Sequence, residues 1–465
     1  MSGRPIGERH RWLALTVLLI PAALALLSVT SVNVALPAIR AGLGADAVGQ
    51  SLVLTAYALV FALILLPAGR WGDQFGHKKV FIAGAVSFTV SSVWCGLAPD
   101  VTQLVLARAL AGLGAGLVMT PVNALIQLLY QGPERARPFG VMGAVFGAAS
   151  AAGPLLGGLL IEAGGELGWR LVFLTNAPFG VLAAALAVVV LPAAEPRGAR
   201  GADPVGLTLF TAGLIGTMLP FSLGADPHAG DAALLAAGLG LLALFALWAR
   251  HRERRGAFTV VPPRLFRQRA LPIGVAVTFL GFAGFTASFL LLALLWQDAL
   301  GHSPLAAGLL VTPFALGSVA GASSTQSLTR RFGTRIVTAG LTMITAGLVA
   351  VGVLVLALAP ALNFWIMLVP LLVTGLGVGL FVGPNTNASF AQTEGGDAGV
   401  ASAMVTAAQR CGTAVGIGLL SVLYATLPGG PAALGPQAVA AFVTAAFAGA
   451  AALLMVLSRR SALDR

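Results

Sequence analysis

The sequence predicts an all-α protein that crosses a membrane many times. Of its 465 residues, 58% are apolar and only 9% are charged, whereas about a quarter of the residues are charged in an ordinary soluble domain. Apolar stretches of about 20 residues recur along the whole chain, and each is long enough to cross roughly 30 Å of hydrocarbon as a helix. The two cysteines exclude a disulfide-rich secreted scaffold, and the apolar content excludes a disordered chain.

Fourteen of these stretches are predicted to be membrane helices. In chain order they cover residues 12–38, 50–69, 80–98, 102–128, 138–162, 171–192, 204–223, 231–249, 271–296, 304–327, 335–359, 363–386, 398–425 and 436–458. The first is far longer than the roughly 7–15 apolar residues of a signal peptide, so we expect an uncleaved helix. Membrane-spanning strands would show about ten residues of alternating polarity, and that pattern is missing from the sequence.

The distribution of basic residues orients the chain. With a cytoplasmic N-terminus, 23 of the 27 Lys and Arg residues fall in cytoplasmic segments, and only Arg40 and Arg170 fall in outer ones. Cytoplasmic loops of membrane proteins carry such an excess, so both termini are predicted to be cytoplasmic. The same rule accounts for the net charge of +11, which in a soluble protein would suggest a nucleic-acid partner. No nucleic-acid partner is expected here.

The spans divide into two bundles with an insertion between them. Residues 1–192 are predicted to form an N-terminal six-helix bundle, and residues 271–465 a C-terminal one. Residues 193–250 then hold an inserted pair of membrane helices, and residues 251–270 form a basic cytoplasmic linker. Because an inserted pair of helices crosses the membrane twice and returns the chain to the same side, the second bundle keeps the orientation of the first.

A glycine-rich basic turn follows the second predicted helix. It reads Gly69-Arg70-Trp71-Gly72-Asp73-Gln74-Phe75-Gly76-His77-Lys78-Lys79, and a weaker copy, Phe332-Gly333-Thr334-Arg335, follows the tenth helix. The glycines allow a tight turn and close helix approach. Asp73 can accept hydrogen bonds from basic neighbours or from a helix N-terminus. The repetition indicates a duplicated bundle, and a plain basic turn is the alternative interpretation.

Two arginines, Arg108 and Arg410, lie inside predicted helices. A charged side chain in the bilayer costs several kcal/mol unless it faces the bundle interior or water. Arg108 lies about a turn or two inside its helix, so its side chain either extends to the outer interface or faces the interior. A charge at Arg410 needs a water-filled or paired site.

The fifth predicted helix carries a run of small residues that ends in Gly-Pro-Leu-Leu-Gly-Gly. Its glycines are Gly147, Gly153, Gly157 and Gly158, and small residues at this spacing let helix backbones approach closely. Pro154 bends the helix and frees backbone carbonyls. General small-residue packing is the alternative interpretation.

These motifs resemble the major facilitator superfamily, and more narrowly its fourteen-span drug:proton antiporters. The segments Trp169-Arg170-Leu171-Val172-Phe173-Leu174-Thr175-Asn176-Ala177-Pro178-Phe179-Gly180 and Val32-Asn33-Val34-Ala35-Leu36-Pro37 add to the resemblance. It implies the major facilitator fold and the export of drugs or amphiphilic metabolites by secondary active transport with alternating access. It also implies that the loop containing Gly69, Asp73, Gly76, Lys78 and Lys79 holds the two halves in the outward-facing state. Arg108 would then influence proton handling, and the fifth-helix run would be an antiporter motif.

Two positions depart from the family pattern. Ala111 stands in place of a glutamine in Arg-x-x-Gln-Gly, and Leu27-Ser28 stands where Leu-Asp is common. None of the sixteen carboxylates lies in the middle of a predicted helix, although a buried carboxylate is the usual proton carrier. Asp73 and Asp298 are the nearest candidates. Proton coupling is therefore an open question, and an uncoupled facilitator or importer of the same fold is the alternative.

The missing acid also bears on the substrate. Without a central anion, we expect neutral or anionic amphiphiles to be favoured over lipophilic cations, with Arg108 or Arg410 as a counter-charge. The polar residues predicted to line a central cavity are Ser28, Ser31, Asn33, Asn123, Gln127, Gln297, Asn385 and Asn387. The alternative role for these polar residues is hydrogen bonding between helices. Phe279, Phe282, Phe285 and Phe289 share one helix face, which is either a cavity wall or a lipid contact.

An integral membrane enzyme is a remote alternative. It would need clustered nucleophiles, metal ligands or paired carboxylates near one face. The sequence has no Cys/His ligand set and its acids are scattered, so we expect no enzyme activity, no metal and no cofactor. A receptor or scaffold would need a sizeable domain outside the membrane. We therefore expect a multi-pass carrier of the cell membrane that works as a monomer in the lipid bilayer, with protons as a candidate second cargo.

Overall fold

The computed structural model describes residues 8–130, 134, 136–192, 203–223, 229–267, 269–358, 361–390, 398–429 and 432–463. All regular secondary structure in these ranges is helical, which confirms the predicted all-α class. The α-helices are α1 (Glu8–Leu43), α2 (Ala47–Phe75), α3 (His77–Leu97), α4 (Val101–Leu129), α5 (Ala136–Gly164), α6 (Gly168–Leu174), α7 (Asn176–Val190), α8 (Pro204–Leu223), α9 (Ala229–Arg254), α10 (Ala270–Leu294), α11 (Pro304–Leu310), α12 (Thr312–Phe332), α13 (Arg335–Leu358), α14 (Phe364–Phe390), α15 (Ala398–Thr426) and α16 (Leu434–Leu463). Short helical turns are η2 (Gly165–Leu167), η3 (Pro263–Phe266) and η4 (Leu295–Ala299).

Helices occupy all fourteen predicted ranges, but two of the predicted helices are broken. The sixth splits into α6 and α7 at Thr175, and the tenth splits into α11 and α12 at Val311. Within the described residues, eleven helical stretches are long and apolar enough to cross a membrane. One of them, Ala148–Val190, runs through α5, α6 and α7, while α8 offers only the shorter stretch Pro204–Pro220. A total of fourteen crossings is compatible with these helices and stays a prediction.

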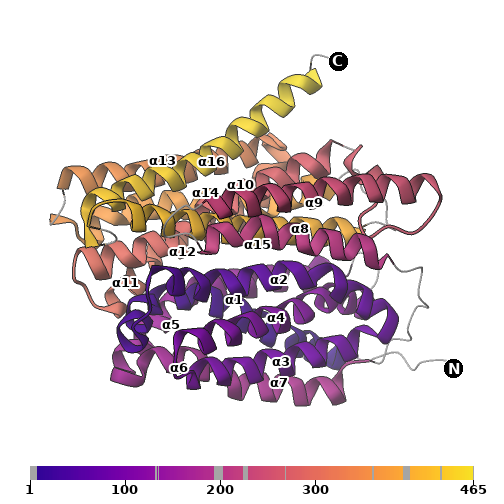
Figure 1. Ribbon diagram of the computed structural model, residues 1–465, viewed down its shortest axis with the longest axis horizontal. Coiled ribbons are helices and arrows are strands. Elements are labelled where there is room, and N and C mark those ends of the chain that lie inside the picture. Colours follow the sequence, from indigo (N-terminus) through magenta and orange to yellow (C-terminus); the bar gives the residue numbers. More distant parts are fainter. Residues whose placement is uncertain are drawn as a thin grey trace.

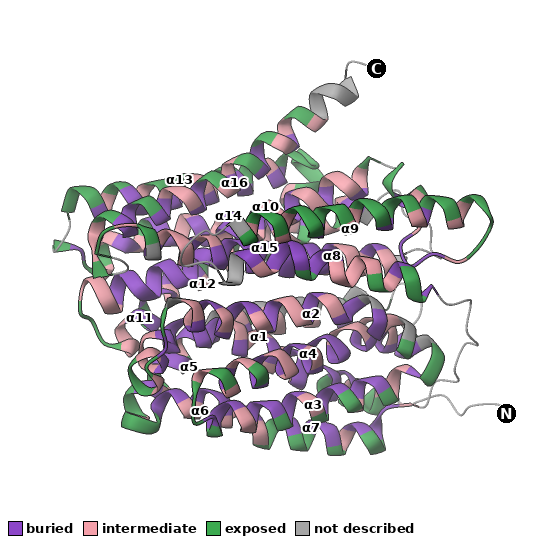
Figure 2. Ribbon diagram, in the orientation of Figure 1, coloured by how far each residue is buried: buried purple, intermediate pink, exposed green. Residues whose placement is uncertain are grey.

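The helices lie in two layers. Figure 1 shows α1 to α7 as one layer and α10 to α16 as the other, with α8 and α9 beside the second layer. Buried residues follow the faces where helices meet, and exposed residues follow the outer sides of α7 and α9 (Figure 2). Because a bilayer offers the backbone no hydrogen-bonding partner, helices satisfy their own N–H and C=O groups and can present apolar side chains outward. Lipid is the natural environment of these outer faces.

The two layers touch along two seams. Helix α15 packs against α2, and α5 packs against α11 and α12. Helix α8 contacts both α2 and α15, so the α8–α9 pair covers the first of these seams. Only 17% of the apolar window of α9 is buried inside the protein, against 61% for α2. The domain boundaries predicted from the sequence are consistent with this arrangement and remain predictions.

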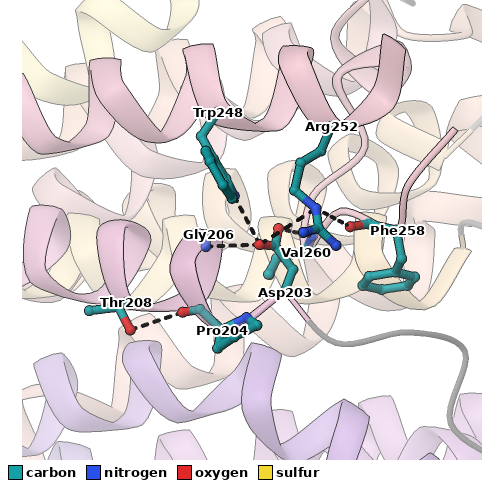
Figure 3. A network of polar contacts seen from close by, with 8 residues as sticks. All are labelled: Asp203, Pro204, Gly206, Thr208, Trp248, Arg252, Phe258 and Val260. Atoms are coloured by element: carbon teal, nitrogen blue, oxygen red, sulfur yellow. Dashed lines mark hydrogen bonds and ion pairs between the residues drawn. The ribbon is translucent and has the colours of Figure 1, made fainter. Parts of the chain in front are cut away.

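A buried carboxylate anchors the inserted pair (Figure 3). Asp203 caps α8, since its Oδ1 accepts a hydrogen bond from Gly206 N at 2.9 Å. It also accepts from Trp248 Nε1 of α9 at 2.9 Å and from the backbone N of Val260 at 3.4 Å. The Arg252 guanidinium lies 3.9 Å from the same carboxylate. One side chain therefore joins the start of α8, the end of α9 and the linker that follows.

Candidate functional site

Arg108 is held inside the first layer by three helices. Its side chain is only 1% exposed. Nε donates to the Val53 carbonyl of α2 at 2.9 Å, and Nη1 donates to Ser28 Oγ of α1 at 3.2 Å. The guanidinium carbon lies 4.3 Å from the centre of the Tyr57 ring, a cation–π contact. Of the two placements open from the sequence, the structure shows the interior one.

Ser28 therefore contacts the membrane arginine at the position where an acid is common in the resembling family. Ser28 is 2% exposed, and its hydroxyl is an acceptor for Arg108. Arg108 forms no ion pair within the described ranges, so its charge is balanced by dipoles and an aromatic face. This arrangement supplies hydrogen bonding at the position but no proton-carrying group.

Arg410 lies on α15, at the seam with α2. It is 7% exposed, and its Nε is buried without a hydrogen-bond partner. Its guanidinium carbon lies 4.3 Å from the centre of the Phe61 ring. Phe61 and Tyr57 contact each other edge to face, with centroids 5.9 Å apart. The aromatic pair of α2 thus separates the two membrane arginines.

Helices α1 and α10 both finish at the end of the molecule that lies far from the N-terminus (left in Figure 1). We call this end the distal end. At the distal end the two layers are joined by polar contacts. Arg40 Nη2 of α1 lies 2.8 Å from Asp298 Oδ1 of η4. Gln297 Nε2, also of η4, donates to the Val34 carbonyl of α1 at 3.1 Å. The Asp298 side chain is only 8% exposed, and its Oδ2 has no hydrogen-bond partner.

The small residues of α5 face two different helices. Gly153 and Gly157 face α1, where an added Cβ would meet Thr30 or Ser31. Gly158 faces α11, where a Cβ would lie 2.5 Å from the Pro304 carbonyl oxygen. Pro154 is buried between these contacts. Gly147 belongs to α5 as well, but its surroundings lie outside the described part of the chain.

The glycine-rich basic turn is built within the first layer. Gly76 has φ of +96°, a conformation that favours glycine. Lys78 Nζ donates to the carbonyls of Val188 at 2.8 Å and Leu191 at 2.7 Å, and so caps the end of α7. Gly69 packs near Thr120, and Lys79 is exposed. The Asp73 side chain lies outside the described residues, and a gating role for this loop stays a prediction.

The other predicted cavity residues are dispersed. Ser31 donates to the Leu27 carbonyl at 2.8 Å, and the Asn33 Oδ1 is buried without a partner. Asn385 Nδ2 donates to Thr278 Oγ1 at 2.8 Å and to the Gly274 carbonyl at 3.2 Å, so it joins α14 to α10. Asn123 is half-buried and Asn387 is exposed. The Gln127 side chain lies outside the described residues.

The phenylalanine face of α10 forms part of the protein core. Phe285 stacks on Phe314 with centroids 5.6 Å apart, and Phe282 lies 6.3 Å from Phe381. Phe289 contacts both Phe285 and Phe314. Phe289 is buried, and Phe282 and Phe285 are half-buried, so the choice between a cavity wall and a lipid contact stays a prediction for this face. Phe279, the fourth residue of the predicted face, packs in a different apolar cluster with Leu59 and Cys411.

Three residues of these sites were not predicted from the sequence. Tyr57 and Phe61 line the two arginines, and Asp203 anchors the inserted pair. Tyr57 is one of only three tyrosines in the chain and falls inside an apolar span, which is a usable signal. Asp203 directly precedes Pro204, a pattern typical of a capped helix start.

Comparisons with known proteins agree with this architecture. A family model described as the Major Facilitator Superfamily matches residues 18–286. The probable actinorhodin transporter of Streptomyces coelicolor is 36% identical over 442 residues, which cover 92% of this chain and 75% of that one. Puromycin resistance protein pur8 of Streptomyces alboniger is 34% identical over 422 residues, covering 90% and 82%.

A solved structure shows the same fold at low sequence identity. An auto-inhibited peptide transporter of the POT family superposes with a TM-score of 0.72 at 18% identity, covering 96% of this chain and 97% of that one. The family model and the two Streptomyces relatives confirm the family resemblance drawn from the sequence motifs, and the solved structure confirms the fold.

Proposed function

Because this chain belongs to the major facilitator superfamily, we propose that it exports amphiphilic small molecules from the cell by alternating access, driven by protons. The chain is a multi-pass membrane transporter and not an enzyme. Export is supported by the relatives, which include a probable actinorhodin transporter and a puromycin resistance protein. The cell membrane is the proposed location, with both termini in the cytoplasm.

The contact between the layers at the distal end carries this proposal. With the orientation predicted from the basic residues, the distal end faces outward. The Arg40–Asp298 ion pair, the Gln297–Val34 hydrogen bond and the close approach of Gly158 to α11 then close the outer side. An exporter that alternates must open this side to release its substrate. These contacts would break and re-form in each cycle.

Asp298 is the residue we assign to proton coupling. Opening the distal end would remove Arg40 from its carboxylate, which is 2.8 Å away in the closed form. The released carboxylate is then accessible from the outside and can bind a proton there. Closing the distal end restores the ion pair, and for export to be driven by protons the displaced proton must then pass inward to the cytoplasmic side. Proton movement would in this way depend on the state of the outer contact.

An uncoupled facilitator is the second candidate function. It is favoured by Ser28, a non-titrating residue that satisfies Arg108 where an acid is common in the family. Within the described residues, no carboxylate pairs with either membrane arginine. A carrier of this kind would move substrate only down its own gradient.

Transport by inverted membrane vesicles separates the two candidates. We expect uptake of an amphiphilic dye to follow an imposed pH gradient and to stop when an ionophore collapses it. The D298N variant should lose gradient-driven uptake at least tenfold and keep exchange of labelled for unlabelled dye. The matched control is E162Q, which changes an exposed carboxylate near the C-terminal end of α5. Uptake that ignores the ionophore in the wild type would establish the facilitator instead.

A further inference from the structure

Arg410 differs from Arg108 in being unsatisfied. Arg108 donates to a carbonyl and a hydroxyl and contacts an aromatic face. Arg410 is also more than nine-tenths buried, but its Nε has no hydrogen-bond partner among the described residues. No ion pair to Arg410 occurs in the part of the chain that the structure describes. A buried N–H of a guanidinium that lacks an acceptor is strongly disfavoured, so the Arg410 side chain points to a partner that the described residues do not supply.

The surroundings of Arg410 define what could satisfy it. The Phe61 ring covers one face of the guanidinium at 4.3 Å. The N–H groups at the edge of the guanidinium form a fork suited to carboxylate or sulfonate oxygens. Phe61 packs with Tyr57, Ala25 and Ala407 in one apolar cluster that includes residues of both layers, so these apolar side chains would become available to a ligand when the layers separate.

We propose that Arg410 binds the anionic group of the exported amphiphile at the seam between α15 and α2, with the Tyr57–Phe61 pair contacting its apolar part. This inference rests on the proposed export function and names the substrate class. Arg410 lies on α15 and Phe61 on α2, so a ligand here touches both layers. A ligand held by both layers is released when they separate, as alternating access requires.

Matched dyes test the charge preference. Fluorescein and rhodamine 123 share a xanthene framework but carry opposite charge, and N-phenyl-1-naphthylamine is a neutral third probe. The purified protein is reconstituted in phosphatidylcholine vesicles, so that no anionic lipid can occupy Arg410. We expect the wild type to transport fluorescein at least tenfold better than rhodamine 123, and to bind it measurably by fluorescence polarisation in detergent.

Variants of Arg410 test whether this residue causes the preference for the anionic dye. R410Q should lower both transport and binding of fluorescein at least tenfold while leaving N-phenyl-1-naphthylamine transport within twofold of the wild type. R410K, which keeps the charge but not the fork, should recover part of the loss. R330Q removes an exposed positive charge at the end of α12 and is the matched control. Transport of the neutral probe also reports that the R410Q variant is folded.

Two results would overturn the assignment and leave export intact. One is fluorescein transport by R410Q at the wild-type rate. The other is a wild type that moves the neutral or cationic dye in preference to fluorescein. If the wild type moves none of the three dyes, the proposed export function fails together with the inference.

Discussion

At the scale of single residues, the two buried arginines differ in how their guanidinium groups are satisfied. Arg108 is fixed by contacts within one layer, to Val53, Ser28 and Tyr57. Arg410 lies at the contact between layers and leaves a buried donor free. The first arginine is suited to holding three helices together, and the second to recognising a ligand. The role of a single charged residue in a membrane span therefore depends on the groups that contact it.

Removing the acceptor of Arg108 should destabilise the first layer. In S28A the Nη1 donor keeps its burial but loses the hydroxyl 3.2 Å away. An unsatisfied buried donor costs about 1–3 kcal/mol, so we expect a lower melting temperature in detergent. S28D supplies a carboxylate to the same donor and should melt no lower than the wild type. The control T426A removes an exposed hydroxyl near the end of α15, and an equal loss in that variant would contradict the assignment.

At the scale of helices, the breaks that the sequence analysis missed lie next to prolines. Helix α12 begins at Thr312 with Pro313 in its first turn, and α7 begins at Asn176 with Pro178 two residues later. Proline is compatible with a first helical turn, where its missing N–H has no partner to lose. Hydropathy cannot detect such breaks because both sides of each one are apolar. It detects spans reliably because the bilayer requires long apolar helices.

The α5–α11 contact should be sensitive to a single methyl group. In G158A the new Cβ would lie 2.5 Å from the Pro304 carbonyl oxygen, so the helices must move apart. Overpacking of this kind costs about 1–3 kcal/mol, and we expect a lower melting temperature and slower dye transport. Gly240 of α9 has no atoms within 4 Å of its added Cβ. G240A is therefore the control, and equal behaviour of the two variants would argue against close packing at Gly158.

Asp203 should fix the inserted pair to its linker. D203A removes the acceptor of Gly206 N, Trp248 Nε1 and Val260 N. The two backbone donors are buried, and a buried donor left unpaired costs about 1–3 kcal/mol. We expect faster proteolysis in residues 255–262 and a lower melting temperature. E253Q alters an exposed carboxylate whose bond to Arg264 N is 3.1 Å. Cleavage of E253Q as fast as that of D203A would show that Asp203 is not the anchor.

At the scale of the whole molecule, the sequence predicted the class, the helix positions and the family, but not the contacts that make up the sites. Apolar spans and motif spacing are local features, and they identified Arg108, Gly158 and the α2–α3 turn. The partners of these residues come from helices far apart in the chain, such as Ser28 with Arg108 and Arg40 with Asp298. Such pairings depend on how the bundles assemble, so no local pattern could supply them.

In the proposed transport cycle, the two layers close and open at the distal end. The measurement uses the double variant R40C/D298C, treated in membrane vesicles with a short bis-methanethiosulfonate, which links the two thiols through disulfide bonds that a reductant can cleave. The native cysteines, Cys95 and Cys411, are both buried and free. Exchange of labelled for unlabelled dye does not need the coupling residue, so it reports the motion alone. We predict that cross-linking abolishes this exchange, that a reductant restores it, and that either single variant is unaffected. Undiminished exchange in the fully cross-linked protein would show that transport does not require the layers to separate at the distal end.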